Sequence, residues 1–286
     1  MDARPPVPAG LPAQLADLGR CLVMGVLNVT PDSFSDGGLY VEARAAVARG
    51  LAMRAAGADL VDVGGESTRP GAERIPVVEE LDRVLPVVRA LVAEGVLVSI
   101  DTMRAEVAHA ALASGAVVIN DVSGGLADPE MLGLVATVHK PYIVMHWRGP
   151  ATVMASLTEY DDVVRDVRRE LSKRLSEAVT AGVDPAYVVL DPGLGFAKES
   201  GHNWSLLAHL SDLSALGRPL LVGASRKRFL GDVLSGAPPE ERDAATAATS
   251  ALAAAAGAWC VRVHEPATSL DAVRVGAAWR AAGGGS

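Results

Sequence analysis

The chain has 286 residues, 50% of them hydrophobic, and a formal net charge of -8 at pH 7. This length can bury one large core, and the acidic balance, without a dominant lysine and arginine run, argues against nucleic acid or a membrane surface as a partner. Residues 1–20 contain paired prolines and no apolar segment of the signal-peptide kind, so we expect a flexible N-terminal tail and a cytoplasmic protein.

Short runs rich in valine, isoleucine and leucine recur along the chain, and each is followed by a longer segment with helical spacing of apolar residues. This alternation predicts parallel strands joined by crossover helices. The predicted strands are Cys21–Leu27, Leu60–Val63, Val96–Ile100, Ala116–Ile119, Tyr142–Met145, Tyr187–Leu190, Leu220–Gly223 and Trp259–Val263. The predicted helices are Glu42–Ala56, Val78–Ala93, Ala105–Ala113, Pro129–Val138, Asp161–Ala181, Trp204–Leu213, Pro239–Ala256 and Thr268–Arg280.

Eight such units are the number that closes a (β/α)8 TIM barrel, an α/β fold that typically needs about 250 residues. We therefore expect a single barrel domain over residues 21–280 and a flexible tail over residues 281–286. The two cysteines, Cys21 and Cys260, lie in short apolar runs and are expected to be buried thiols.

Polar residues stand at or just past the end of each predicted strand. The set comprises Asn28, Gly64 with Glu66, Asp101, Asn120 with Asp121, His146, Asp191, Ser225 and His264. In a barrel these ends converge on one mouth, where active sites are built. Each residue alone could be a cap or a turn residue, but the whole series predicts one site.

Two loops near the start of the chain have the composition of ligand-binding segments. The segment 28–38, NVTPDSFSDGG, combines carboxylates, hydroxyls and Phe34 with glycines, which suits a mobile lid, although an ordinary long turn has the same composition. The segment 64–71, GGESTRPG, offers accessible backbone N–H groups, hydroxyls and Arg69, a plausible cradle for phosphate or carboxylate.

Asp101, Asn120 and Asp191 end the third, fourth and sixth predicted strands. A carboxylate that accepts two adjacent N–H groups, beside an amide that both donates and accepts, suits a 2-amino-4-oxo heterocycle with a guanine-like edge. The same acids could instead bind a metal, although the absence of an early H-x-H pair argues against a zinc hydrolase barrel.

The last two strands are followed by cationic groups. In the segment 223–231, GASRKRFLG, Ser225 stands at a predicted helix N-cap before three cations, which predicts an anion site with Lys227 as the main contact. In VRVH, Arg262 and His264 are two residues apart and lie on the same side of a strand, a pair of donors suited to a diphosphate.

Together, GVLNVTPDSFSDGG, DVGGESTRPG, SIDT, NDVSGG, DPGLGF, GASRKRFLG and VRVH resemble the dihydropteroate synthases, in that family's order and over nearly the whole chain. The composition, rich in alanine, arginine and valine, resembles actinobacterial members. The resemblance implies a transferase of folate biosynthesis that forms a C–N bond. Its substrates would be (7,8-dihydropterin-6-yl)methyl diphosphate and 4-aminobenzoate, and its products 7,8-dihydropteroate and diphosphate. It also implies a Mg2+ cofactor, a homodimer and membership of a family that sulfonamides target.

The resemblance assigns roles to residues by matching motif positions. Asn28 matches the magnesium ligand. The matches to pterin diphosphate contacts are Thr68, Arg69, Asp101, Asn120, Asp191, Lys227, Arg262 and His264, of which Asp101, Asp191, Lys227, Arg262 and His264 form the predicted catalytic set. The 4-aminobenzoate side matches Phe34, Pro70 and Ser225, and the first mobile loop matches Asp32 and Ser33.

Three other functions remain open from the sequence. A pterin-binding methyltransferase barrel would share the acids, an aldolase would use Lys227 as a Schiff base, and a non-catalytic paralogue would bind a pterin without turnover. The first loop and the SRK motif favour the synthase. Product formation from 4-aminobenzoate, borohydride trapping and diphosphate release would separate these functions.

Overall fold

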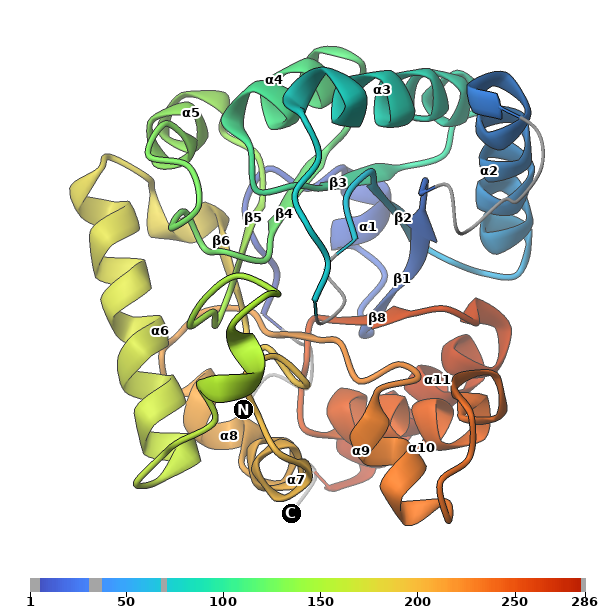
Figure 1. The fold of residues 1–286 in the computed structure, drawn as a ribbon. Helices are drawn as coiled ribbons and strands as arrows, with labels where there is room; N and C mark the ends of the chain where they lie inside the picture. The colour runs from blue at the N-terminus through green and yellow to red at the C-terminus, as the bar shows by residue number, and fades with distance from the viewer. Residues whose placement is uncertain (1–5, 31–37, 68–70, 284–286) are drawn as a thin grey trace.

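The computed structural model describes residues 6–30, 38–67 and 71–283. Eight parallel strands run in the order β6-β5-β4-β3-β2-β1-β8-β7, and a bridge between Leu190 and Leu220 joins the two end strands into a barrel. Their bounds are β1 Leu22–Asn28, β2 Leu60–Gly64, β3 Val98–Asp101, β4 Val118–Asp121, β5 Tyr142–Met145, β6 Val188–Asp191, β7 Leu221–Val222 and β8 Cys260–Val263. The predicted TIM barrel is confirmed, and every predicted strand lies within two residues of an observed one at both ends (Figure 1).

Helices surround the strands, as the prediction required (Figure 1). Their bounds are α2 Gly38–Ala55, α3 Val77–Ala93, α4 Ala105–Ala113, α5 Met131–Val138, α6 Val163–Thr180, α7 Ser200–Ala208, α8 Leu210–Ser214, α9 Arg228–Val233, α10 Asp243–Ala255 and α11 Pro266–Gly283. Gly57 and Gly115 follow helices with φ of +97° and +104°, a backbone region that favours glycine. Both glycines therefore suit the turns that follow α2 and α4.

One predicted helix, Trp204–Leu213, is instead two helices. The chain breaks between α7 and α8 at His209, whose φ of -118° and ψ of 33° are not helical. The imidazole Nδ1 of His209 lies 2.8 Å from the carbonyl oxygen of Ser205. The backbone N–H of His209 still donates to the same carbonyl oxygen at 3.2 Å, so the imidazole shares the last helical acceptor of α7.

The interior of the barrel at the N-terminal end of the strands is apolar. The residues packed there are Leu22, Met24, Leu60, Val118, Ile143, Val189, Leu221, Trp259 and Cys260. They fill the interior in layers contributed by neighbouring strands, as in other barrels of this kind. A larger apolar cluster lies between the outer faces of the strands and the helices. Cys21 and Cys260 are both buried free thiols, as expected.

The N-terminal segment closes this apolar end, so the predicted tail over residues 1–20 is wrong for its second half. A short helix, α1 Ala13–Ala16, places the 5% exposed Leu15 against the barrel interior. The guanidinium of Arg20 pairs with both carboxylate oxygens of Asp59 at 2.7 and 2.8 Å. At the other terminus, α11 continues to Gly283, into the region expected as a tail.

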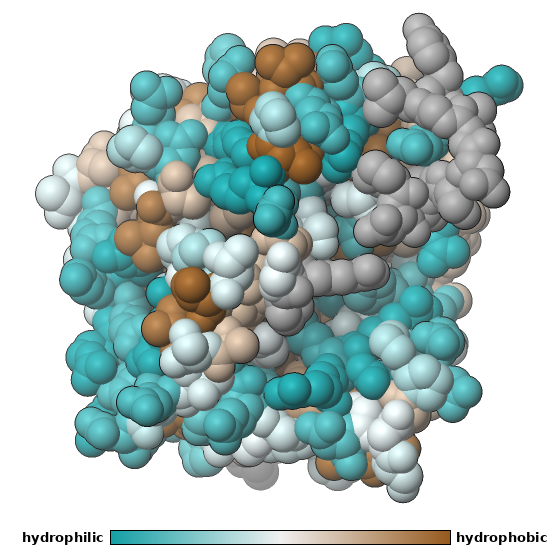
Figure 2. All heavy atoms as spheres, in the orientation of Figure 1, coloured by the Kyte–Doolittle hydropathy of each residue, from teal (hydrophilic) through white to brown (hydrophobic). Residues whose placement is uncertain are grey.

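Within the described ranges, no helix has both the length and the apolar character needed to cross a bilayer. The face that looks into the barrel mouth is mostly hydrophilic, with small hydrophobic patches (Figure 2).

Candidate active site

The carboxyl ends of the strands carry a polar layer directly above the apolar one. On each of four strands the side chain two residues beyond an apolar interior residue is polar, because alternate residues of a strand face the same side. The pairs are Leu60 and Asp62, Val118 and Asn120, Val189 and Asp191, and Cys260 and Arg262. Asp101 joins this layer from β3, where it is paired in register with Asn120. We call the layer formed by Asp62, Asp101, Asn120, Asp191 and Arg262 the acid layer.

Arg262 lies at the centre of the acid layer. Its Nε donates to Asp62 Oδ2 at 2.6 Å, and its Nη2 donates to Asp101 Oδ2 at 2.5 Å. Asn120 Nδ2 donates to the same oxygen of Asp62 at 2.8 Å. Two of the three guanidinium nitrogens of Arg262 are therefore bound to carboxylates, so Arg262 belongs to the floor of the site together with the acids.

Asp62 is a site residue that the sequence prediction missed. It is fully buried inside β2, and its Oδ1 has no hydrogen-bond partner in the described part of the chain. The prediction concentrated on the residues that end strands, whereas Asp62 lies in the middle of the run LVDVG. The available signal was a carboxylate inside an apolar strand, because a buried acid is rare unless it is paired.

The acids have shifted pKa values with physical causes in the geometry. Burial raises the pKa of Asp101 to about 7, although the positive charge of Arg262 opposes this shift. Burial also raises the pKa of Asp191, against the charge of Lys227 and the N–H of Gly193. Desolvation therefore destabilises both carboxylates, while the neighbouring cations favour their ionised forms.

Asp191 and Lys227 face each other across Gly223. A Cβ at this glycine would lie 3.8 Å from Lys227 Nζ and 3.9 Å from Asp191 Oδ2. Asp191 Oδ1 accepts a hydrogen bond from the N–H of Gly193 at 2.7 Å. Lys227 Nζ donates to the carbonyl oxygen of Leu194, and burial lowers its pKa to about 8 despite the charge of Asp191. This pair presents one carboxylate oxygen and an ammonium group to the barrel mouth.

Ser225 has a different structural role from the one predicted. The helix α9 begins at Arg228 without a side-chain cap, so Ser225 is not its N-cap. The Ser225 hydroxyl instead accepts a hydrogen bond from the backbone N–H of His264 at 3.1 Å and lies 2.9 Å from His264 Nδ1. Burial lowers the pKa of His264 to about 3, and the charge of Arg262 adds to this shift. Ser225 and His264 thus form one neutral pair at the ends of β7 and β8.

Arg226 and Lys227 are neighbours in the chain but contact different groups. Arg226 forms a bidentate ion pair with Asp243 at 2.7 Å for each nitrogen–oxygen pair, which ties it to α10. Lys227 is the member of the run that approaches Asp191, and its Nζ also lies 4.8 Å from the centroid of the Phe196 ring.

Three predicted strand-end residues hold loops rather than the acid layer. Asp121 accepts hydrogen bonds from Ser123 and Gly125 and from the Tyr142 hydroxyl. Glu66 accepts from Arg74, Ile75 and Arg104. His146 is 2% exposed and bonds to Glu170 and Lys198.

Six predicted site residues lie outside the described residues. They are Asp32, Ser33, Phe34, Thr68, Arg69 and Pro70. Asn28, the predicted magnesium ligand, ends β1 in register with Gly64 and is half-buried. Among the described residues, no group of three or more histidine, cysteine, aspartate or glutamate side chains is arranged to hold a metal ion.

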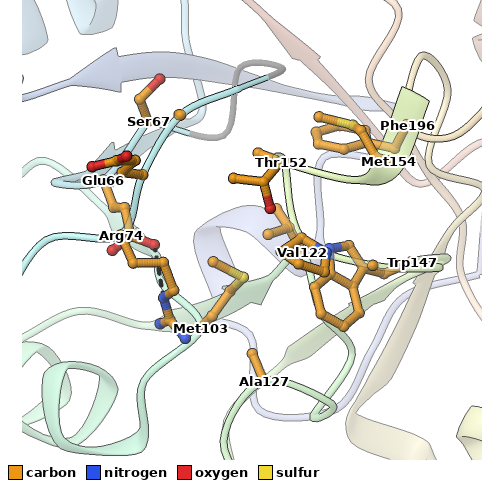
Figure 3. A pocket seen from close by; sticks show the side chains of 15 residues that line it. Glu66, Ser67, Arg74, Met103, Val122, Ala127, Trp147, Thr152, Met154 and Phe196 are labelled. Atoms are coloured by element: carbon orange, nitrogen blue, oxygen red, sulfur yellow. Dashed lines mark hydrogen bonds and ion pairs between the residues drawn. The ribbon is translucent and has the colours of Figure 1, made fainter. Parts of the chain in front are cut away.

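A cavity of about 280 Å³ opens beside the acid layer, on the side of β2 to β6. Its apolar lining includes Met103, Val122, Trp147, Met154 and Phe196. In Figure 3 the Trp147 and Val122 side chains stand together across the cavity from the Glu66 and Arg74 ion pair. Phe196 lines this cavity, and its ring also lies beside Lys227, so this one side chain borders both the cavity and the ammonium group next to Asp191.

Residues 24–264 match the sequence profile of a family described as pterin binding enzymes. The chain is 56% identical over 267 residues to the dihydropteroate synthase of Mycobacterium leprae, with 91% of this chain and 94% of that protein aligned. The chain belongs to the dihydropteroate synthase family. This result confirms the resemblance predicted from the motifs, and the mycobacterial relative is consistent with an actinobacterial type of synthase.

Solved dihydropteroate synthases share the fold. A structure from Xanthomonas albilineans with 4-aminobenzoic acid has 47% sequence identity and a TM-score of 0.85, and covers 92% of this chain and 93% of that one. A structure of the Xanthomonas albilineans synthase in complex with 7,8-dihydropteroate has 44% identity and a TM-score of 0.82, and covers 92% of this chain and 94% of that one.

Proposed function

We infer that the chain catalyses the dihydropteroate synthase reaction of folate biosynthesis. In this reaction (7,8-dihydropterin-6-yl)methyl diphosphate and 4-aminobenzoate give 7,8-dihydropteroate and diphosphate. The observation that carries the inference is the layer of Asp101, Asn120, Asp191 and Lys227 at one end of a closed barrel, in a chain whose family membership is established by 56% identity to a dihydropteroate synthase.

We propose that the pterin ring binds to this layer. Asp191 Oδ2 can accept N–H groups of the ring, because Oδ1 is already bound to Gly193. The Asn120 amide oxygen can accept one more N–H, since its nitrogen donates to Asp62. The ammonium group of Lys227 supplies the donor for the ring's carbonyl oxygen. This set of one donor and several acceptors matches a 2-amino-4-oxo edge.

The acids also suit the charge that develops during the reaction. The bond between the methylene carbon and the diphosphate oxygen breaks, and its electron pair leaves with the diphosphate. The nitrogen lone pair of 4-aminobenzoate forms the new C–N bond, and the amine then loses a proton. Asp101, held by Arg262 at 2.5 Å, would stabilise the positive charge that bond breaking leaves on the pterin.

We propose that the diphosphate binds near Asn28 and the neutral His264. The side-chain amide oxygen of Asn28 is a hard ligand at a strand end, which fits Mg2+, since this ion commonly takes one or two protein ligands together with phosphate oxygens. When bound, Mg2+ would neutralise charge on the diphosphate. Arg69 remains a predicted contact of the same group.

The 4-aminobenzoate side is proposed at Ser225, with Phe34 and Pro70 from the two N-terminal loops. Thr68 stays a predicted pterin contact, and Asp32 and Ser33 stay predicted members of the mobile loop. Closure of the loops that carry Phe34 and Arg69 would exclude water, so that the amine rather than hydroxide captures the carbon.

We further propose a cytoplasmic homodimer. The exposed hydrophobic residues Leu252 of α10 and Val275 and Trp279 of α11 have exposed fractions of 66%, 65% and 77%. These two helices pack side by side in Figure 1, and a surface of this kind is typical of an interface. Sedimentation of the chain and of Trp279→Glu would test this, with a dimer expected for the first and a monomer for the second.

The proposed function is tested by diphosphate release when the purified chain is mixed with both substrates, with and without Mg2+. We expect stoichiometric formation of diphosphate and dihydropteroate, and none when either substrate is omitted. Tight pterin binding without diphosphate release would instead identify a non-catalytic paralogue. Methyl transfer to or from a pterin without reaction of 4-aminobenzoate would identify a methyltransferase.

A further inference from the structure

A second buried ionic group lies behind the acid layer and contains none of the predicted catalytic residues. Lys198 and His146 are 5% and 2% exposed, so almost no water reaches either side chain. Glu170 of α6 and Arg148 lie on the outer side of the pair, with side-chain exposures of 30% and 20%. Burying an ammonium group is costly unless its hydrogen bonds are satisfied.

The ammonium group of Lys198 uses all three of its protons. Nζ lies 2.9 Å from His146 Nδ1, 3.0 Å from the carbonyl oxygen of Gly193 and 3.1 Å from the carbonyl oxygen of Phe196. An ammonium group cannot accept a hydrogen bond, so Nδ1 of His146 is the acceptor. The imidazole proton is therefore on Nε2, which donates to Glu170 Oε2 at 2.8 Å.

The charges of this chain of hydrogen bonds follow from its surroundings. Burial lowers the pKa of His146 to about 4, and the charge of Lys198 adds to this effect, so the imidazole is neutral. Burial acts to raise the pKa of Glu170, but the hydrogen bonds from His146 and Arg148 outweigh it and bring the pKa to about 2. An anion, a neutral imidazole and an ammonium group thus follow one another toward Asp191.

Lys198 holds the turn that shapes the acid layer. The carbonyl oxygens that it binds belong to Gly193 and Phe196, and the N–H of Gly193 donates to Asp191 Oδ1 at 2.7 Å. Gly193 has a φ of +66°, and a Cβ there would meet the carbonyl oxygen of His146. Phe196 lines the cavity and lies beside Lys227. One buried ammonium group therefore contacts the turn from which both Asp191 and Phe196 extend.

The buried ionic group of Lys198, His146, Glu170 and Arg148 also fixes the loop after β5. Arg148 pairs with both oxygens of Glu170 at 3.1 and 2.7 Å and lies 3.8 Å above the ring centroid of Tyr160. The Tyr160 hydroxyl donates to the carbonyl oxygen of Ala197 at 3.0 Å. Lys198 at one end of this series of contacts, and Arg148 at the other end through Tyr160, are therefore both attached to the turn over residues 191–198, DPGLGFAK.

We propose that Lys198, oriented by His146 and Glu170, is a positioning residue of the synthase that fixes the Asp191 turn. Beside Lys227 and Arg262 it supplies a further buried positive charge that keeps Asp191 ionised for pterin binding. This inference rests on the proposed function, because it assigns Asp191 to the pterin. Lys198 contacts no substrate in this account. Its effect passes through Gly193 and the electrostatic field at Asp191.

The proposal predicts a pH dependence. Burial lowers the pKa of Lys198 to about 7, with Asp191 and Glu170 opposing the shift and Lys227 and Arg148 adding to it. Above that pH the charge of Lys198 is lost, so only Lys227 and Arg262 among these cations still favour ionised Asp191, and pterin binding weakens. Lys227, whose pKa burial lowers to about 8, contributes a separate loss at higher pH.

The test is the dissociation constant of 6-hydroxymethylpterin, an unreactive ligand, measured by calorimetry from pH 6 to 9 for the wild type, Lys198→Met, Lys198→Arg and Glu170→Gln. The titration of the ligand itself is common to all variants and cancels in ratios. Lys173→Met, which removes a 71% exposed lysine of α6, is the matched control. Thermal unfolding of each variant shows which of them retain the fold.

We expect Lys198→Met to bind about tenfold more weakly at pH 6.5 and to lose the weakening near pH 7, because its charge is absent throughout. Lys198→Arg should keep tight binding above pH 7, since arginine stays protonated. Glu170→Gln should lose affinity at a pH about half a unit to one unit lower than the wild type, because it removes an anion that favours protonated Lys198.

The inference is overturned if Glu170→Gln and Lys198→Arg both show the pH profile of the wild type, which would leave Lys198 with a purely structural role. A lower melting temperature with equal loss of binding at all pH values would lead to the same conclusion. Failure of the proposed function is a separate result, because it would show as an absence of diphosphate release by the wild type.

Discussion

The two ends of the barrel interior differ although the same strands build both. At the N-terminal end the interior holds side chains such as Leu60 and Val189, closed by Leu15 of α1. Two residues further along the same strands, the interior holds Asp62 and Asp191. The first end gains free energy from burying apolar surface, whereas the second buries charges that are costly without partners. Stability and ligand binding are therefore separated along each strand by about 7 Å of backbone.

The largest effect is expected from the polar end. Asp101→Asn should lower kcat for dihydropteroate formation about 10³-fold, equivalent to about 4 kcal/mol. The reason is that the carboxylate stabilises the positive charge that the pterin carries only while the bond to diphosphate breaks. The KM for 4-aminobenzoate should change by less than about threefold, since this acid lies on the pterin side. Steady-state kinetics with both substrates measures the two effects, and an unchanged kcat would contradict the role given to Asp101.

The same substitution has an expected pH signature in stability. The pKa of Asp101 is raised to about 7 in the folded chain, against an ordinary value of 3.8. The folded state therefore binds more protons than the unfolded state between these values, so this group lowers stability as pH rises through the window. The free energy of unfolding of Asp101→Asn relative to wild type should increase from pH 5 to pH 7.5. Denaturant titrations at the two pH values check this, and a constant difference would refute it.

At the apolar end the expected loss is in stability alone. Leu60→Ala should lower the free energy of unfolding by about 3 kcal/mol, because it empties a fully buried site between strands. The kcat of the folded variant should stay within about twofold of the wild type. Leu126→Ala, at a 46% exposed leucine, is the matched control for denaturant unfolding. A large drop in kcat of the fully folded Leu60→Ala variant would show that the two ends of the barrel interior are not independent.

The smallest effect is expected where α1 covers the apolar end. Leu15→Ala should cost about 2 kcal/mol in the free energy of unfolding, less than Leu60→Ala, because a short terminal helix can adjust around the gap. Leu18→Ala, at a 40% exposed position of the same segment, should change stability by less than about 0.5 kcal/mol. Equal effects of the two substitutions would show that the segment is a tail after all.

The barrel was predictable because strands buried on both faces are continuous apolar runs, which the helical segments interrupt at regular intervals. The segments that the sequence did not reveal are short. The helices α1 and α9 have four and six residues, too few for a clear periodic pattern. The division of α7 from α8 occurs at His209, whose non-helical backbone conformation no pattern of apolar residues indicates.

The site was predictable where a polar residue ends an apolar strand, as Asp101, Asn120 and Asp191 do. The sequence did not show Asp62, which lies inside a strand, or Lys198, which lies seven residues after Asp191 in a loop. Their importance arises from contacts made across the barrel, between Asp62 and Arg262 and between Lys198 and His146. At Ser225 the sequence pattern was misleading. Serine is typical of a helix N-cap, but this hydroxyl accepts a hydrogen bond from the backbone N–H of His264, just past β8.

The division of the barrel into two functional ends is tested most directly by one calorimetric titration, with 6-hydroxymethylpterin as the ligand, of the wild type, Asp62→Asn and Leu60→Ala. The two substituted residues are neighbours on the interior face of β2, so position is matched and only the layer differs. We predict that Leu60→Ala binds within about threefold of the wild type, whereas Asp62→Asn binds at least about tenfold more weakly, because Arg262 and Asn120 lose their shared anion. Equal weakening in both variants, or wild-type binding by Asp62→Asn, would contradict the division of the barrel into a structural end and a binding end.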